Sequence, residues 1–323
     1  MSDDQFAIQL RKLNRYFGRK HVVRDLNLRV PKGQVTALLG LNGAGKTTTI
    51  RMLMGLLAPT RGHASVLGED ALAMSTGTRA KVGYLVEGHF LYPSMRVRDC
   101  QSFQRAGYPT WNDHLFVDIV DHFGIDRQAK VSTLSRGQRA GVALALVLAP
   151  DPELLVLDDP ALGLDPVSRR ALNETLVEFA GNGKRTVLLS THLIDDVERI
   201  ADRVAVMVGG RLKVDTSLDE FVGRVSMLSL PESSIDADQL ASLTGLIEAR
   251  RLGSGTTARW QLTLVDVDES ATNQIERLSG TPPERMEATL NEAVLAYLVR
   301  ERGDGSFFSK PLIAKANEEG ATV

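Results

Sequence analysis

A glycine-rich segment near the start of the chain places the strongest constraint on the fold. An apolar run, 34–39, precedes this segment, and a run suited to a helix, 48–57, follows it. Glycines let consecutive backbone N–H groups surround an anion, and a helix that starts there directs its positive end at the same anion. A strand, this loop and a helix in that order predict a phosphate-binding loop. The loop consists of Gly40, Leu41, Asn42, Gly43, Ala44, Gly45, Lys46 and Thr47, and Thr48, which begins the following run, is also expected to contact the ligand.

Two side chains at the end of the loop suit a nucleoside triphosphate. Lys46 can reach the β- and γ-phosphates, and the hydroxyl of Thr47 can bind Mg²⁺. Kinases, GTPases and motor proteins share this loop. The loop alone therefore predicts the class of ligand and leaves the reaction open.

Two carboxylates follow an apolar run far downstream. Residues 154–157 are apolar, and Asp158 and Asp159 come directly after them. This pattern predicts a buried parallel strand that delivers Asp158 to a Mg²⁺ ion beside the phosphates. The carboxylates and the phosphate loop are then expected to share one site.

A second segment with anion-binding character precedes a helix-like stretch, 139–148. It places a serine and a glycine where the N-terminus of a helix can hold a second anion. Its residues are Leu134, Ser135, Arg136, Gly137 and Gln138.

The order of these elements over residues 1–223 resembles the nucleotide-binding subunits of ABC transporters. The Leu-Ser-x-Gly-Gln signature is the specific element, because other phosphate-loop classes lack it. The resemblance implies an α/β P-loop NTPase core of ABC type, with a helical subdomain at 97–145 that carries the signature at its end. It also implies ATP and Mg²⁺ as cofactors. A basic residue such as Arg136 within the signature resembles the export-type branch of the family.

The resemblance also assigns roles to weaker motifs. Phe17, or the adjacent Tyr16, is the aromatic residue expected to stack on adenine. Glu87 is expected to sense the γ-phosphate and to help bind Mg²⁺. Asp165 lies in the loop that crosses between two subunits, and His192 resembles the histidine switch at the γ-phosphate.

Each weaker motif has an ordinary structural alternative. An isolated aromatic residue is usually part of a core, and a lone histidine after a strand is usually a hydrogen-bonded polar residue. The other histidines show no metal-ligand spacing, so we interpret them as surface or packing residues. They are His21, His63, His89, His114 and His122.

Asp159 departs from the family pattern, which has a glutamate that polarises the attacking water. Aspartate is shorter by one methylene, which reduces its reach by about 1.5 Å. Since a misplacement of about 1 Å can cost about 10²-fold in rate, we expect slow but real hydrolysis. Glu87 also departs, because the family commonly has glutamine there. The carboxylate adds negative charge near the triphosphate, so a bound metal ion should be more important at this site than with glutamine.

Composition agrees with an intracellular ATPase that works with a separate membrane protein. The 323 residues carry a formal net charge of −2 and a single cysteine, Cys100. No run of like charges suggests DNA or RNA binding. No apolar stretch reaches the roughly 20 residues that a bilayer requires, and the acidic N-terminus lacks a secretion signal. We therefore expect a cytoplasmic protein held at the inner face of the plasma membrane by an integral-membrane permease.

The apolar cluster 90–93 follows the Glu87 segment directly. It either packs into the core or forms a docking surface for the permease. The sequence does not distinguish these alternatives.

The pattern changes after residue 223. Strands are expected at 225–230, 246–252 and 258–265, and helices at 236–243, 270–278 and 290–300. A small α+β accessory domain at 224–302 is therefore predicted, with a role in dimer contact or regulation. Residues 303–323 are expected to be a flexible tail.

The predicted function is ATP binding and hydrolysis by a dimer that powers an exporter. Each active site combines the phosphate loop of one chain with Ser135 and Gly137 of a second copy, or of a paralogous ATPase subunit. Two alternatives stay open: a regulatory ABC protein with little hydrolysis, and a soluble ABC ATPase outside transport.

Overall fold

The computed structural model describes residues 5–181, 183, 185–267, 269–302 and 312–314. The chain forms two compact units, Met1–Thr216 and Ser217–Val323. This division falls earlier than the expected boundary after residue 223, because α8 (Leu218–Gly223) belongs to the second unit. There the ring of Phe221 lies 5.1 Å from that of Tyr297.

A six-stranded sheet forms the centre of the first unit, in the order β10-β9-β3-β8-β7-β6. Strand β3 runs parallel to β8 and β9, and β7 runs parallel to β6 and β8. Every residue of β3, β7 and β8 is buried, as expected for parallel strands covered on both faces. The strands are β3 (Val35–Leu39), β6 (Val82–Leu85), β7 (Leu154–Asp158), β8 (Thr186–Thr191), β9 (Arg203–Val208) and β10 (Arg211–Ser217).

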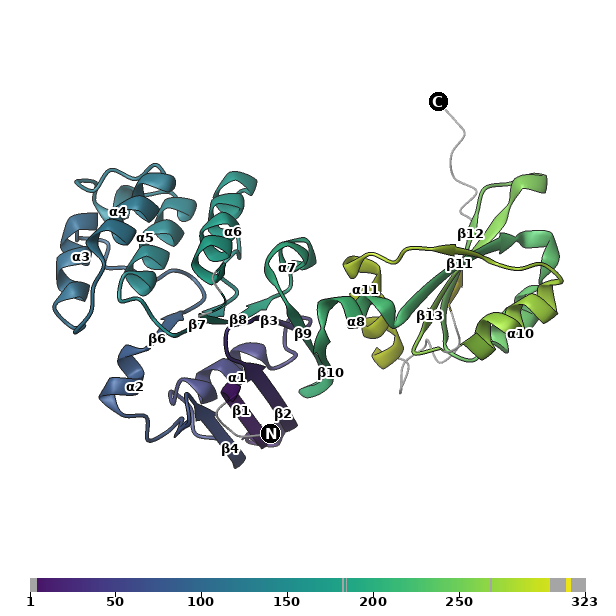
Figure 1. The fold of residues 1–323 in the computed structure, drawn as a ribbon, viewed down its shortest axis with the longest axis horizontal. Helices are drawn as coiled ribbons and strands as arrows, with labels where there is room; N and C mark the ends of the chain where they lie inside the picture. Colours follow the sequence, from purple (N-terminus) through teal and green to yellow (C-terminus); the bar gives the residue numbers. More distant parts are fainter. Residues whose placement is uncertain (1–4, 182, 184, 268, 303–311, 315–323) are drawn as a thin grey trace. The chain divides into compact units, whose positions relative to one another are not determined.

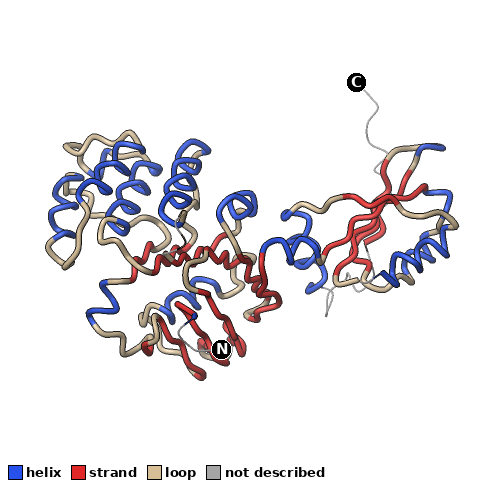
Figure 2. The backbone as a smooth tube through the Cα atoms, in the orientation of Figure 1, coloured by secondary structure: helices blue, strands red, loops and turns tan. Residues whose placement is uncertain are grey.

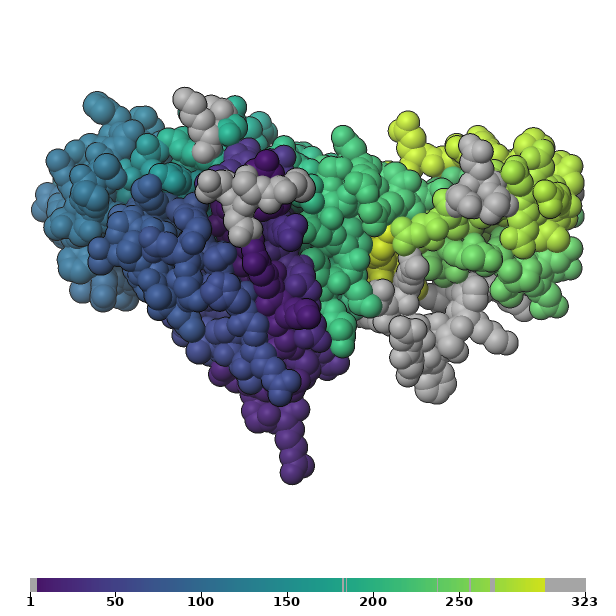
Figure 3. Space-filling view, turned by 60° about the horizontal axis from the view of Figure 1, so that its bottom comes forward, coloured from purple at the N-terminus to yellow at the C-terminus, as the bar shows by residue number. Residues whose placement is uncertain are grey.

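A second, antiparallel sheet, absent from the elements predicted above, lies on one side of the first (Figure 1). Its order is β2-β1-β4-β5, from β1 (Phe6–Phe17), β2 (Lys20–Pro31), β4 (Arg61–Val66) and β5 (Glu69–Asp70). Figure 2 shows both sets of strands in red with α1 (Lys46–Leu53) between them. In Figure 3 the purple N-terminal strands lie against the blue residues that follow α1.

Helices cover the opposite side of the six-stranded sheet (Figure 1). Helices α3, α4 and α5 form the helical region that the sequence predicted. Phe116 and Ile119 on α4 are buried and contribute to the core of this region. Besides α1, the helices of the unit are α2 (Thr76–Ala80), α3 (Val97–Arg105), α4 (Asp113–His122), η2 (Val131–Thr133), α5 (Arg136–Leu148), α6 (Pro166–Ala180) and α7 (Ile194–Ile200).

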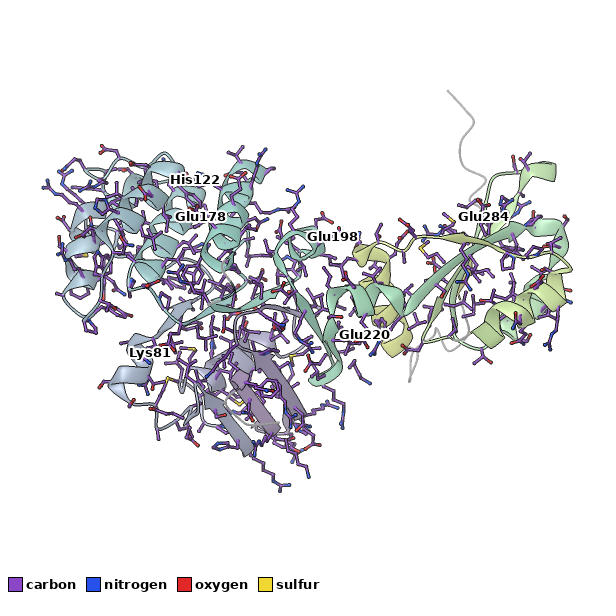
Figure 4. All side chains as sticks on the ribbon, viewed as in Figure 1. Lys81, His122, Glu178, Glu198, Glu220 and Glu284 are labelled. Atoms are coloured by element: carbon purple, nitrogen blue, oxygen red, sulfur yellow. The ribbon has the colours of Figure 1, made fainter. Side chains whose placement is uncertain are left out.

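An ion pair joins the loops that lead into two neighbouring strands of the six-stranded sheet, β6 and β7. Lys81, labelled in Figure 4, precedes β6 and forms an ion pair of 2.9 Å with Glu153, which precedes β7. Taken together, the parallel sheet, the antiparallel sheet and the covering helices give the predicted fold class, an α/β core of P-loop type with a helical region.

The second unit is a five-stranded sheet with helices, in the order β14-β11-β13-β12-β15. The three longer strands and the helices confirm the predicted elements, whereas β14 and β15 were not foreseen. Glu284 of β14, labelled in Figure 4, accepts a hydrogen bond of 2.9 Å from Arg259 of β13. The elements are β11 (Val225–Pro231), η3 (Glu232–Ser234), α9 (Ala237–Ala241), β12 (Leu246–Leu252), η4 (Gly255–Thr257), β13 (Arg259–Val265), α10 (Glu269–Ser279), β14 (Glu284–Met286), α11 (Leu290–Arg302) and β15 (Leu312–Ala314).

The predicted flexible tail falls mainly on 303–311 and 315–323, which lie outside the described residues. Between them, β15 pairs in parallel with β12, with Ile313 opposite Ala249. These three residues are therefore part of the sheet.

Candidate functional site

The phosphate loop connects β3 to α1 and ends at Gly45, which is the N-cap of α1. Gly43 and Gly45 have φ of 82° and 104°, a region that glycine adopts without strain. A Cβ at Gly45 would lie 3.1 Å from the carbonyl oxygen of Val22, so the loop also needs glycine for packing. The N-terminus of α1 therefore points its free N–H groups toward the loop, as an anion site requires.

Lys46 is the first residue of α1, and its side chain turns back over the loop. Its Nζ donates a 2.7 Å hydrogen bond to the carbonyl oxygen of Gly40. The residue is 7% exposed. Burial lowers the pKa of Lys46, while the charges of Asp159, Asp158 and Glu87 oppose that shift. The carboxylates favour the charged form of Lys46, and its buried ammonium group is suited to bind the phosphate groups of a polyanionic ligand.

Asp158 ends β7 and is fully buried at the base of the phosphate loop. Its Oδ1 accepts hydrogen bonds from Thr47 Oγ1 (3.1 Å) and Ser190 Oγ (2.8 Å). Its Oδ2 has no hydrogen-bond partner among the described residues. A buried carboxylate oxygen is costly without a partner, so this atom is suited to a cation.

Asp159 and His192 contact each other directly. Asp159 Oδ2 and His192 Nδ1 are 2.8 Å apart, and Asp159 Oδ1 is buried without a partner in the part of the chain that the structure describes. The backbone of Asp159 has φ of 48°, in the left-handed region, and its N–H donates to both the carbonyl and the hydroxyl oxygen of Ser190 at 3.1 Å. The sequence named both side chains separately and did not foresee their contact.

A cleft of about 590 Å³ brings most of the predicted residues together. Phe17 and Glu87 lie on its wall, whereas Tyr16 stacks on His21 with ring centroids 3.8 Å apart. Of the two aromatic candidates, Phe17 is therefore the one in the cleft. The lining residues are Phe17, Lys20, Val22, Asn42, Gly43, Ala44, Gly45, Lys46, Thr47, Thr48, Glu87, Asp158, Asp159 and Leu162.

The chemistry of this cleft fits Mg²⁺. Thr47 offers a hydroxyl oxygen, and Asp158 and Glu87 offer carboxylate oxygens, the ligand type that Mg²⁺ prefers. No cluster of three or more histidine, cysteine, aspartate or glutamate side chains able to hold a metal occurs among the described residues. A magnesium ion here would therefore take further oxygens from phosphate and water, which is its usual mode of binding.

The signature segment lies at the start of α5, apart from the residues that line the cleft. Ser135 is the N-cap: its Oγ accepts from Gln138 N (3.1 Å), and Gln138 Oε1 accepts from Ser135 N (3.0 Å). The hydroxyl hydrogen of Ser135 stays available to an anion. Ser135 and Arg136 are exposed, and the guanidinium of Arg136 donates to the carbonyl oxygen of Gly163 at 3.2 Å.

Gly137 packs against the start of α6. A Cβ at this position would lie 1.8 Å from Ser168 Oγ and 3.3 Å from Asp165 Oδ2. Asp165 is the N-cap of α6 and accepts hydrogen bonds from Val167 N and Ser168 N (both 3.0 Å). The hydroxyl and N–H of Ser168 hold the pKa of Asp165 below its usual range. The signature segment and the Asp165 loop therefore form one packed surface.

His89 is a residue whose contacts the sequence did not reveal. It is 4% exposed and its Nε2 donates to the carbonyl oxygen of Pro160 at 2.9 Å. Burial lowers the pKa of His89. The sequence interpretation as a surface or packing residue missed this bond. The sequence held one indication that His89 lies close to the site, namely its position two residues after Glu87.

An apolar groove of about 190 Å³ runs beside β6, α3 and α5. Phe90 is 80% exposed and Tyr92 is 64% exposed at its rim. The ring of Tyr92 meets that of Phe103 edge-on at 6.3 Å. Core packing therefore does not explain the 90–93 cluster, since its two aromatic side chains face outward.

Comparison with known proteins agrees with this geometry. The family model described as ABC transporter matches residues 23–162. The chain is 36% identical over 232 residues to "Nod factor export ATP-binding protein I" of Bradyrhizobium diazoefficiens, covering 69% of this chain and 76% of that protein.

Solved structures give the same picture. The "Structure of ATP binding subunit of ABC transporter" has a TM-score of 0.60 and 28% identity, covering 67% of this chain and 91% of that one. The dimeric structure of a bacterial ABC transporter cassette is similar in fold, with a TM-score of 0.58 at 20% identity, covering 65% of this chain and 98% of that one. Among the described residues, none of the helices has the length and apolar character needed to cross a membrane.

Proposed function

Because this chain belongs to the ABC transporter family, as an ATP-binding subunit of the export type, we propose that it hydrolyses ATP to drive a separately encoded membrane permease. One observation carries the proposal. Lys46, Asp158 and Asp159 meet at one cleft, and each aspartate has a buried oxygen without a hydrogen-bond partner among the described residues. Such atoms suit MgATP and an attacking water.

The phosphate loop and Lys46 bind the triphosphate. Backbone N–H groups at the start of α1 surround the phosphate oxygens, and the ammonium of Lys46 stabilises charge on the γ-phosphate as it leaves ADP. Thr47, Asp158 and Glu87 would hold Mg²⁺, which neutralises phosphate charge when bound. Phe17 lies on the cleft wall, where it is available to stack on the adenine ring.

Asp159 orients the water that attacks the γ-phosphorus. Its Oδ2 is held by His192, so Oδ1 remains to accept a hydrogen bond from the water. The contact with His192 limits the rotation of the Asp159 side chain, which favours one direction of attack. The same imidazole has a second nitrogen, Nε2, for contact with the γ-phosphate.

A second copy of the chain, or a paralogous subunit, completes each site. Ser135 and Arg136 are exposed and lie outside the cleft lining, so the signature of one chain does not reach the phosphates of its own cleft. The signature of a partner would cap the γ-phosphate with Ser135 and the N-terminus of α5. Gln138 keeps the cap of α5 in place, and Asp165 presents the adjoining loop to the partner.

The groove at Phe90 and Tyr92 is the proposed docking surface for the permease. Exposed aromatic side chains around an apolar groove are characteristic of a protein interface. Docking there would hold the chain at the inner face of the plasma membrane. For the second unit, which contains the accessory domain expected at 224–302, we propose a role in dimer contact or regulation.

A single-turnover measurement tests the role of Asp159 and the rate. We expect Asp159→Asn to lower the rate of γ-phosphate cleavage by about 10²-fold or more, because an amide accepts a proton poorly. Asp159→Glu, which restores the family residue, is expected to cleave faster than the wild type. Equal rates for the wild type and Asp159→Asn would remove Asp159 from the role of base.

Asp159 also supports a second candidate, a regulatory ABC protein with little hydrolysis. The shorter side chain reaches less far toward an attacking water, which favours a long-lived ATP-bound state. This candidate predicts ATP-dependent dimerisation with negligible cleavage in the wild type, and cleavage that appears after Asp159→Glu. Co-purification with an integral-membrane protein separates both from a soluble ABC ATPase outside transport.

A further inference from the structure

We propose that His89 is a positioning residue that fixes the backbone beside Asp159, and through it the direction of the carboxylate that orients the attacking water. The inference rests on the proposed role of Asp159. His89 itself touches neither substrate nor metal in this scheme, so it acts through the main chain.

The first observation is the hydrogen bond between His89 and Pro160. His89 is 4% exposed, and its Nε2 lies 2.9 Å from the Pro160 carbonyl oxygen. Because the partner is a carbonyl, Nε2 must carry the hydrogen. A buried bond of this kind joins two loops that are far apart in sequence, one after β6 and one after β7.

The second observation is the geometry of Asp159. Its φ of 48° is in the left-handed region, which non-glycine residues adopt only when their surroundings hold them there. Ser190 holds the N–H of Asp159 from one side. On the other side, the ring of Pro160 fixes the φ angle of that residue. When His89 also holds the Pro160 carbonyl, few backbone torsions remain free to change the conformation of Asp159.

The third observation is that His89 is itself held in place. Its φ is 50°, also left-handed, and it follows Gly88, whose φ is 94°. His89 lies in the wall of the apolar groove and two residues after Glu87, which lines the nucleotide cleft. The hydrogen bond from His89 to Pro160 thus connects two left-handed residues, because Pro160 directly follows Asp159 in the chain.

Three substitutions in the full chain separate the bond from the bulk of the side chain. His89→Gln keeps an N–H donor, while His89→Leu keeps apolar volume and loses the donor. His89→Gly loses the donor and suits the left-handed backbone, so it remains informative if His89→Leu folds poorly. His114→Leu, at an exposed position on α4, is the matched control.

The measurement is kcat and KM for MgATP together with the melting temperature of each variant. We expect His89→Leu and His89→Gly to lower kcat by about 10- to 100-fold with KM within about twofold of the wild type, because Asp159 is misdirected while ATP binding is intact. His89→Gln is expected to recover most of kcat, and His114→Leu to match the wild type.

Two outcomes would overturn the inference. One is a wild-type kcat in both donor-free variants. The other is a loss of kcat in His89→Gln equal to that in His89→Leu, since a role that depends only on shape would give that result. Asp159→Asn is measured in parallel. If it is slow while the donor-free variants are fast, the inference fails and the proposed function stands. If Asp159→Asn is as fast as the wild type, both fail.

Discussion

Two aspartates in the two units of this protein have nearly the same backbone and opposite surroundings. Asp159 follows β7 with φ of 48°, and Asp266 follows β13 with φ of 51°. Asp159 is buried, and its Oδ1 has no hydrogen-bond partner among the residues described. Asp266 is exposed and accepts a hydrogen bond of 2.8 Å from the hydroxyl of Tyr297. A left-handed aspartate after a strand is therefore not by itself a sign of function.

Burial of charge is what separates the units. In the first unit Lys46, Asp158 and Asp159 are buried around one cleft. In the second unit, none of the charged side chains whose burial is described at 217–302 is buried. Burying charge without full pairing is costly, so a fold keeps such groups where a ligand compensates them. The first unit has such buried charges at its cleft. The core of the second unit is an apolar cluster.

A core substitution in the second unit gives the largest expected effect. Phe221 is fully buried and packs on Tyr297. Phe221→Ala should destabilise the second unit by about 3–5 kcal/mol. The chain has two tryptophans, Trp111 in the first unit and Trp260 in the second. Urea unfolding in a Trp111→Phe background therefore reports the second unit alone.

The control for Phe221→Ala is a Trp260→Phe background, in which Trp111 reports the first unit. The Trp111 transition and the ATPase rate should stay near those of the parent. A parallel loss in both reporters would show that the two units unfold together and that their stabilities are not independent.

Lys46→Met tests whether the buried charges of the first unit serve a ligand. We expect kcat for ATP to fall by about 10²- to 10³-fold, because the variant removes the cation that stabilises charge on the phosphates. Lys81→Met, which removes the exposed partner of Glu153, is the matched control and should keep the wild-type rate. A wild-type rate in Lys46→Met would mean that this lysine serves only the fold.

The sequence predicted the site where function depends on neighbours in the chain. The phosphate loop, β7 with its two aspartates and the cap at Ser135 each consist of consecutive residues, so their pattern carries their structure. The contact between Asp159 and His192 and the bond from His89 to Pro160 join distant segments. Such contacts depend on the order of strands in the sheet, which a single sequence does not display.

Parts of the fold were missed for a related reason. Strands β14 and β15 span three residues each, Glu284–Met286 and Leu312–Ala314, which is too short to show a period of two. The antiparallel sheet of the first unit has bulges between β1 and β2, with register shifts near Leu13. A bulge interrupts the alternation of buried and exposed residues that marks a strand.

Gly137→Ala tests the close packing between the signature segment and the Asp165 loop. A Cβ would lie 2.6 Å from Ser168 Cβ, so α5 and α6 must separate at a cost of about 1–3 kcal/mol. Unfolding followed by Trp111 in the Trp260→Phe background measures the loss. Adding Ser168→Gly should restore part of it.

Gly223→Ala in the second unit is the matched control for Gly137→Ala. Nothing lies within 4 Å of the position that its Cβ would occupy, so little change is expected. If Gly137→Ala is equally harmless, the glycine is not there for packing, and a direct role toward the partner's nucleotide becomes the stronger explanation.

The smallest expected effect is a pH dependence confined to the second unit. Burial, together with the adjacent Asp266, raises the pKa of Tyr297 from 10.0 to about 12. The folded state therefore favours the neutral phenol, so this contribution to stability is complete below pH 10 and is lost as the pH rises through 12. Tyr297→Phe cannot ionise, so its Trp260 urea midpoint should fall less over this range than that of the parent, while the Trp111 midpoint should respond equally in both. Identical Trp260 curves for parent and variant would show that the Tyr297 to Asp266 contact adds nothing to the stability of the second unit.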